Sequence, residues 1–136
     1  MNTKQKLESL RAQMKAQGAD VYLQPVHDEF LNEYPPACNR RVEWLSGFSG
    51  SAGMAVVLAE KAALFVDGRY TLQAKNEVEA ALFEIYNSAD KTFEAWLKEK
   101  AAGAKLAYDP KLFTRDMLKR LGAHPLLAVS NLVDAI

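Results

Sequence analysis

The spacing of apolar side chains divides this sequence into helical and extended segments. Leu7, Leu10 and Met14 lie three or four residues apart with charged residues between them, which predicts an amphipathic helix ending near Gly18. The same period, together with capping residues, predicts three further helices: over residues 70–81, after a cap at Asp90 or Thr92, and from a cap at Thr114 to Gly122.

Short apolar runs bounded by turn residues predict strands. Residues 54–58 and 62–66 flank a polar turn, which is typical of a buried antiparallel hairpin. Further strands are expected over residues 20–23, 82–86, 105–108 and 126–129. Strands that alternate with helices in this way favour an α/β domain with a mixed β-sheet flanked by helices. Residues 24–42 lack a clear period and are expected to form a long loop, a kind of segment that is often functional.

Composition narrows the class of protein. A chain of 136 residues with 49% hydrophobic and 25% charged residues is typical of one soluble globular domain. Seventeen basic residues balance seventeen acidic ones, so no overall charge attracts the chain to nucleic acid or to a membrane. No apolar run approaches the ~20 residues that span a bilayer. The single cysteine, Cys38, cannot form an internal disulfide, which favours a cytoplasmic location.

A glycine-rich segment precedes the hairpin. Gly47, Gly50 and Gly53 allow positive φ angles and the close approach of another backbone or of a ligand, and free amides there can bind an anion. Their spacing matches neither a Walker loop nor the dinucleotide-binding fingerprint. Two interpretations stay open: a tight loop that leads into the hairpin, and a surface that meets a ligand or a partner domain.

A second motif, Asp67-Gly68-Arg69-Tyr70, follows the hairpin directly. Asp67 is expected to cap the next helix, and Gly68 to take an unusual backbone conformation. Arg69 would then lie at the end of a strand, where α/β proteins often bind ligands, and its guanidinium can hold a carboxylate or a peptide carbonyl. The alternative is a structural ion pair between Arg69 and Asp67 or another carboxylate.

Other polar residues give weaker signals. Arg40 and Arg41 are interpreted as a solvated pair that anchors the loop, with Glu43 placed to neutralise one of them. His27 lies beside two carboxylates, but adjacent side chains do not converge on one metal ion, so no metal site is expected. Cys38 has no histidine at motif spacing and is not expected to be a nucleophile.

No complete catalytic constellation is present in the sequence. Neither a His-Glu-x-x-His motif nor a Gly-x-Ser-x-Gly elbow occurs. Trp44, Phe48 and Trp96 are expected in core or interdomain packing, because no basic stripe accompanies them. The residues alone therefore indicate a compact α/β domain with one loop-rich edge.

These motifs resemble the N-terminal domain of the aminopeptidase P family (Xaa-Pro aminopeptidases) in the creatinase/prolidase superfamily. The resemblance is carried by Arg40-Arg41, by Ser46-Gly47-Phe48-Ser49-Gly50-Ser51-Ala52-Gly53, and by Asp67-Gly68-Arg69-Tyr70 with Gln73-Ala74; it continues more weakly through Trp96-Leu97, Asp109-Pro110 and Asn131-Leu132-Val133-Asp134. It implies the creatinase/prolidase N-terminal fold, with its ribonuclease H-like motif.

The resemblance also implies a role for the chain. Residues 1–136 would be one domain of a longer cytoplasmic hydrolase, whose catalytic metallopeptidase domain is absent here. That domain would hold two divalent metal ions, which in this family are usually manganese. This fragment would hold no metal ion, contain no catalytic residue and be inactive alone. Arg69 matches a residue with which the family contacts peptides that carry proline at the second position.

The parent protein is expected to form a homodimer, with peptides and its own catalytic domain as partners, and to bind neither nucleic acid nor membrane. The alternative implied by the same superfamily is a creatinase-like protein-binding module without peptidase activity.

Overall fold

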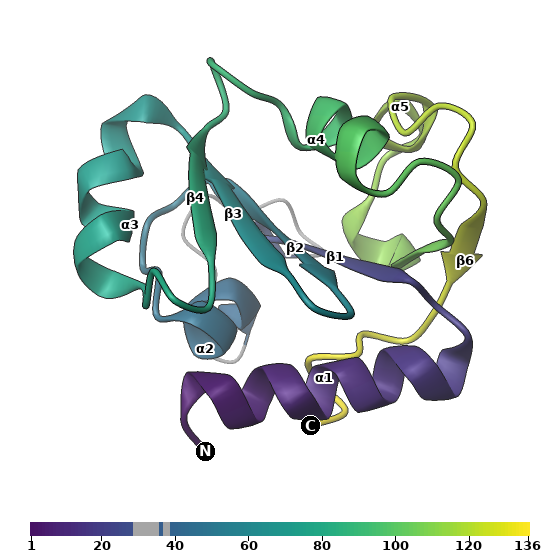
Figure 1. Cartoon of the computed structure of the whole chain (residues 1–136), viewed down its shortest axis with the longest axis horizontal. Coiled ribbons are helices and arrows are strands. Elements are labelled where there is room, and N and C mark those ends of the chain that lie inside the picture. Colours follow the sequence, from purple (N-terminus) through teal and green to yellow (C-terminus); the bar gives the residue numbers. More distant parts are fainter. Residues whose placement is uncertain (29–35, 37–38) are drawn as a thin grey trace.

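A six-stranded mixed β-sheet lies at the centre of the computed structural model, which describes residues 1–28, 36 and 39–136 (Figure 1). The strands are β1 (Val21–Pro25), β2 (Gly53–Leu58), β3 (Ala62–Val66), β4 (Glu84–Asn87), β5 (Leu106–Tyr108) and β6 (Leu126–Ala128), in the order β4-β3-β2-β1-β5-β6. β2 pairs antiparallel with β1 and β3, and the other pairs are parallel. All strands except β2 therefore end at one edge of the sheet, which we call the carboxyl edge.

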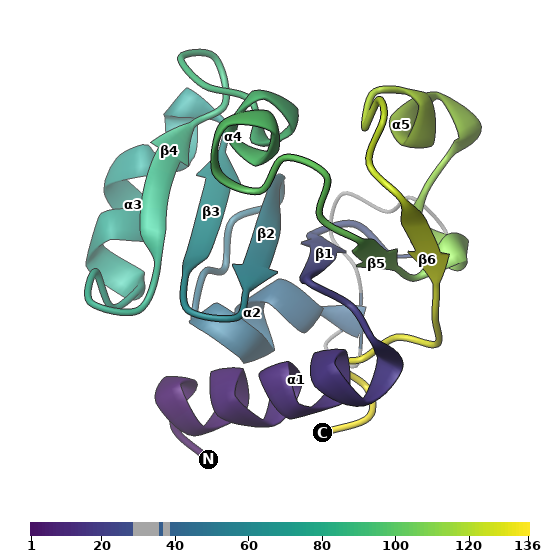
Figure 2. The same cartoon turned by 45° about the vertical axis from the view of Figure 1, so that its right-hand side comes forward.

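Helices cover both faces of this sheet (Figures 1 and 2). They are α1 (Thr3–Gln17), α2 (Arg41–Ser46), α3 (Thr71–Glu77), α4 (Phe93–Lys100) and α5 (Arg115–Lys119), with 3₁₀ turns at Gly68–Tyr70 and Pro110–Leu112. Apolar side chains of α1, α2 and α3 form one core against the first face, and those of α4 and α5 form a second core against the other.

Successive side chains of a strand point to opposite faces of the sheet, so each buried strand contributes residues to both cores. In β1, Tyr22 belongs to the first core, whereas Val21 and Leu23 belong to the second. A strand buried on both faces reads as a continuous apolar run, which is why the hairpin of β2 and β3 was recognisable as buried. The C-terminal segment 131–136 returns to the first face, where Leu132 and Val133 join the core beside α1 (Figure 2).

The structure confirms the mixed sheet, the hairpin and the expected helix caps. Gly18 ends α1 with φ 75°, as expected, and the structure adds a capping box of Asn2 and Gln5 at the start of that helix, which was not predicted. Thr92 and Thr114 cap α4 and α5 through their side-chain oxygens. These signals are local, so the sequence contained them.

Several expected boundaries were wrong, among them the end of the last helix, which lies at Lys119 rather than at Gly122. The helix expected over residues 70–81 ends at Glu77, because Val78 adopts an extended backbone, and Leu72 is 71% exposed rather than buried. The strand that follows begins at Glu84 rather than at residue 82. The loop expected over residues 24–42 is shorter at both ends, since β1 extends to Pro25 and α2 begins at Arg41. The rest of that loop lies largely outside the described residues.

Candidate functional site

Arg69 lies at the carboxyl edge, directly after β3. The Asp67 carboxylate accepts a hydrogen bond from the Arg69 amide at 3.0 Å and caps the 3₁₀ turn, as expected from the motif. That hydrogen bond holds the pKa of Asp67 below its ordinary value. Arg69 Nε also lies 3.3 Å from Asp67 Oδ1, so the structural ion pair exists, while the Arg69 side chain stays 65% exposed. The guanidinium is therefore held at its base and presented to solvent.

Gly68 serves close packing, not an unusual backbone angle. Its φ is not positive, contrary to the expectation from sequence. A Cβ at this position would lie 3.0 Å from Nδ2 of Asn87, at the end of β4. Glycine thus allows the turn before Arg69 to pack against the neighbouring strand.

The glycine loop, residues 47–53, accommodates atoms of its own chain. Gly47 ends α2 with φ 89°, the only positive φ among the loop's glycines. A Cβ on Gly50 would lie 2.2 Å from Cζ of Phe48, so the ring of Phe48 occupies the space that a side chain would need. The structure therefore favours the tight-loop interpretation of this segment.

The glycine loop binds a carboxylate of its own chain, that of Glu77 in α3. The amide and hydroxyl of Ser49 donate to the Glu77 carboxylate at 3.0 and 2.7 Å, and Gln73 donates to both Ser49 Oγ and Glu77 Oε1. Partial burial raises the pKa of Glu77, but the hydrogen bonds from Ser49 and Gln73 outweigh it and the pKa lies below its ordinary value. The loop is thereby tied to α3.

The glycine loop also builds a platform under Arg69. Ser51 Oγ lies 2.6 Å from the Tyr70 hydroxyl, and the ring of Phe48 meets Tyr70 edge-on with centroids 5.9 Å apart. The guanidinium carbon of Arg69 lies 5.0 Å from the centroid of the Tyr70 ring, within the range of a cation–π contact. We call Phe48, Ser51 and Tyr70 the Arg69 platform. It orients a cation at the edge of the domain.

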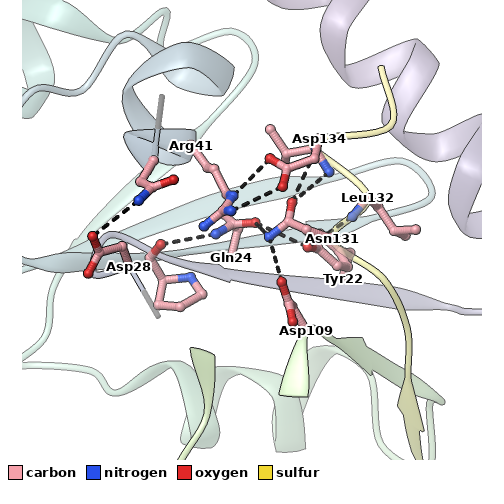
Figure 3. Close-up of polar contacts among 11 residues, drawn as sticks. Tyr22, Gln24, Asp28, Arg41, Asp109, Asn131, Leu132 and Asp134 are labelled. Atoms are coloured by element: carbon pink, nitrogen blue, oxygen red, sulfur yellow. Dashed lines mark hydrogen bonds and ion pairs between the residues drawn. The ribbon is translucent and has the colours of Figure 1, made fainter. Parts of the chain in front are cut away.

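A buried polar network occupies the carboxyl ends of β1 and β5 (Figure 3). Asn131 donates from Nδ2 to Gln24 Oε1 at 3.1 Å and to Asp109 Oδ2 at 3.2 Å. The Tyr22 hydroxyl lies 3.1 Å from Gln24 Oε1 and accepts from the Leu132 amide at 3.2 Å, and burial raises the pKa of this hydroxyl. The network fixes the C-terminal segment to the sheet.

Arg41 extends this network and corrects an expectation. It was expected to be solvated, but it is 6% exposed and bonds both carboxylate oxygens of Asp134 at 2.9 and 3.0 Å (Figure 3). Arg40 does lie near Glu43, at 3.9 Å, as expected. Sequence reasoning missed the role of Asn131; its only signal was one amide within a segment that otherwise looked apolar.

Comparison with known proteins places this geometry in a family. A family model described as the creatinase/prolidase N-terminal domain matches residues 6–136. The chain belongs to this family. Probable Xaa-Pro aminopeptidases P from Pyricularia oryzae and Verticillium alfalfae are each 38% identical to it, over the whole of this chain and 24% of their own length.

Solved structures agree with this creatinase/prolidase N-terminal domain. X-prolyl aminopeptidase from Caenorhabditis elegans, described as a cytosolic enzyme with a di-nuclear active site, matches with a TM-score of 0.91 and 31% identity, over 100% of this chain and 25% of that one. The N-terminal domain of the cytoplasmic peptidase PepQ from Mycobacterium tuberculosis matches with a TM-score of 0.73 and 28% identity, over 96% and 97% of the two chains. The present chain thus spans about a quarter of the curated relatives and corresponds only to their N-terminal domain.

The aromatic residues of this family domain divide into two groups. Phe48 and Trp96 are buried, as expected, whereas Trp44 is 39% exposed and packs under the Lys6 ammonium, which lies 4.3 Å from its ring centroid. Trp44 is therefore a partly exposed surface residue rather than part of the core.

Within the described part of this domain, no group of three or more histidine, cysteine or acidic side chains is placed to hold a metal ion. His27 Nε2 instead lies 2.6 Å from the carbonyl oxygen of Leu112. Glu29, one of the two carboxylates beside His27, and Cys38 fall outside the described residues. Over the described ranges, no helix has both the length and the apolar character needed to cross a bilayer.

Proposed function

We propose that this chain is the non-catalytic N-terminal domain of a metal-dependent Xaa-Pro aminopeptidase, bordering the active-site cleft and helping to position peptides with proline at the second position. The observation that carries the proposal is the presentation of Arg69, 65% exposed, on an ordered platform at the carboxyl edge. Homology over the whole chain to relatives named Xaa-Pro aminopeptidase P supports the substrate class.

Arg69 is proposed to contact the peptide. A guanidinium donates several N–H groups in a fixed plane, so it can hold a peptide carbonyl or carboxylate in one orientation. Holding the peptide in this way lowers the entropic cost of reaching the transition state in the neighbouring domain. The two divalent metal ions, manganese in our proposal, belong to that other domain, as do the catalytic residues. A cytoplasmic homodimer is the proposed form of the parent protein.

The first test is the change Arg69→Ala in the parent enzyme. Loss of a charge-assisted hydrogen bond is worth about 1.5–3 kcal/mol, so we expect kcat/KM for an Xaa-Pro peptide to fall by about 10- to 100-fold. Metal content should stay unchanged. Lys75→Ala, which removes an exposed charge from α3, serves as the matched control and should leave kcat/KM unaltered. An unchanged kcat/KM for Arg69→Ala would refute the role of Arg69.

Hydrolysis assays with added Mn²⁺ test whether catalysis requires the other domain of the parent protein. The parent is expected to release the first residue of an Xaa-Pro peptide, and the isolated chain 1–136 is expected to be inactive. Inactivity of both would favour the creatinase-like binding module. Activity of the isolated chain would show that it contains a catalytic site and would overturn the proposal.

A further inference from the structure

A small pocket opens at the carboxyl edge on the face covered by α4 and α5. It has a volume of about 350 Å³, at the lower end of the range for ligand sites. We call it the α4–α5 pocket; its lining includes the apolar residues Met54, Phe65, Phe93 and Met117 and the polar or charged residues His27, Thr92, Glu94 and Arg120. Nothing in the proposed role of Arg69 uses it.

The floor of the α4–α5 pocket can receive an apolar group. Met54 and Phe65 are 6% and 1% exposed and supply a buried apolar floor, which Phe93 and Met117 extend toward the opening. Methionine side chains adapt their shape to different apolar groups. The volume suits one or two side chains and is too small for a helix, whose diameter is about 10–12 Å with its side chains.

The rim of the pocket carries charge. Arg120 is the exposed residue directly after α5 and makes no ion pair with the described part of the chain, and Glu94 of α4 adds a carboxylate to the same pocket. A guanidinium in that position can donate hydrogen bonds to a carboxylate or carbonyl oxygen. An apolar floor beside Arg120 suits a short peptide that buries one side chain and presents its carboxyl terminus to Arg120 rather than to Glu94.

The pocket and Arg69 flank the ends of the same two strands. Ser88, which lines the pocket, donates its amide to the carbonyl oxygen of Val66, the last residue of β3, at 2.8 Å. The preceding residue, Asn87, packs against Gly68, next to Arg69. One extended peptide crossing the carboxyl edge would therefore meet both features.

We propose that the α4–α5 pocket binds an apolar side chain of the peptide, downstream of its proline, while Arg120 contacts the peptide carboxylate. The inference rests on the proposed function and deepens it, because it assigns to this domain a preference for the residues after the proline. No bond forms or breaks in this step; the pocket selects and holds.

The four methionines of the chain provide a direct test. Met54 and Met117 line the pocket, Met14 lies in the first core, and Met1 is an exposed terminal residue. In the chain labelled with [¹³C-methyl]methionine, titration with the tripeptide Ala-Pro-Leu should shift the methyl signals of Met54 and Met117 and saturate. The signals of Met14 and Met1 should stay in place. Absence of shifts up to the solubility limit, or equal shifts at Met14, would overturn the proposal.

Changes in the peptide and in the rim separate the two parts of the interaction. Ala-Pro-Ala should bind about tenfold more weakly, because less apolar surface enters the pocket. Arg120→Ala and amidation of the Ala-Pro-Leu carboxylate should each weaken binding about fivefold to tenfold, and should not do so additively. Arg115→Ala, at the start of α5 and outside the pocket, should bind like the unmodified chain. Equal affinity for both peptides would overturn the apolar assignment, and unchanged binding by Arg120→Ala would overturn the carboxylate contact.

Failure of this inference is distinguishable from failure of the proposed function. The role of Arg69 is measured by turnover in the parent, and the pocket by methyl shifts in the chain 1–136. Shifts at Met54 and Met117 alongside an unaltered kcat/KM for Arg69→Ala would retain the pocket and refute Arg69. The reverse result would retain Arg69 and refute the pocket.

Discussion

Asn131 joins three parts of the molecule through one side chain. Its amide nitrogen donates to Gln24 in β1 and to Asp109 after β5, and its oxygen accepts from the amides of Val133 and Asp134. Asn131, Gln24 and Asp109 are 7%, 0% and 4% exposed, so water cannot readily replace the hydrogen bonds between their side chains. In such surroundings an unpaired polar group is costly.

Replacing Asn131 should therefore destabilise the domain. Asn131→Ala removes one hydrogen-bond donor from Gln24 Oε1 and one from Asp109 Oδ2, and we expect the free energy of unfolding to fall by about 2–3 kcal/mol. Asn131→Asp should also destabilise, because it sets a second carboxylate beside Asp109. Urea denaturation measures both. Ser130→Ala, at the exposed neighbouring position, should change stability by no more than about 0.5 kcal/mol, and an equally small effect of Asn131→Ala would contradict the network's importance.

Local signals explain which residues could be predicted from sequence. The caps at Asp67, Thr92 and Thr114 act within three residues of their partners, so their motifs are complete in the sequence. Arg41 bonds Asp134 across 93 positions of the chain, and no local pattern reports such a partner. The exposure of Arg69 was inferred from its place after a strand, whereas the platform beneath it became visible only once the glycine loop was placed beside α3.

At the scale of elements, the tie between the glycine loop and α3 is pH-dependent. The Ser49 hydrogen bonds favour the ionised form of Glu77, so the pKa of this carboxyl is lower in the folded chain than in the unfolded chain. Its contribution to stability is therefore complete above the unfolded pKa of about 4.3 and is lost as the pH falls through the folded pKa.

We expect Glu77→Gln to reduce stability at pH 7 and to lose its effect as the pH falls to about 3. Thermal unfolding of both forms across this pH range measures the difference. Lys75→Ala, an exposed change in the same helix that leaves the Ser49–Glu77 hydrogen bonds in place, is the control. A difference in stability that stays constant down to pH 3 would show that the Glu77 carboxylate does not favour the folded state.

The boundaries of elements were less predictable than their existence. The hairpin followed from two apolar runs and a polar turn, and the structure confirms it. The length of α3 did not follow, because Val78 suits a helical face and an extended cap equally well in the sequence. Packing of Ala74 and Val78 into the first core decides the outcome, and this leaves Leu72 facing solvent.

For the whole molecule, the order of the strands sets a gradient of stability. β1 and β2 lie inside the sheet and are buried over most of their length, whereas β6 ends the strand order of the described chain and exposes Leu126 and Ala128. Amide protons of β1 and β2 should exchange with solvent at least about tenfold more slowly than those of β6. Native-state hydrogen exchange followed by NMR measures this. Equal protection of β6 and β1 would indicate that another surface covers the β6 edge.

The fold class was predictable for the whole molecule because its pattern of runs and caps is periodic. The distribution of helices over the two faces was not, since periodicity identifies an apolar stripe and not the face against which it packs. The α4–α5 pocket belongs to this second category: Met54 and Met117 lie 63 positions apart and line one pocket only because α5 folds back over the start of β2.

The Arg41–Asp134 ion pair connects the C-terminal segment mechanically to α2. Asp134 belongs to the C-terminal segment, Arg41 opens α2, and α2 runs directly into the glycine loop that supports Tyr70. A pull on the C-terminal segment must either break two short charged hydrogen bonds or drag α2 along. Force applied at the C-terminal segment is thus transmitted through this ion pair to α2 and to the glycine loop beneath the Arg69 guanidinium.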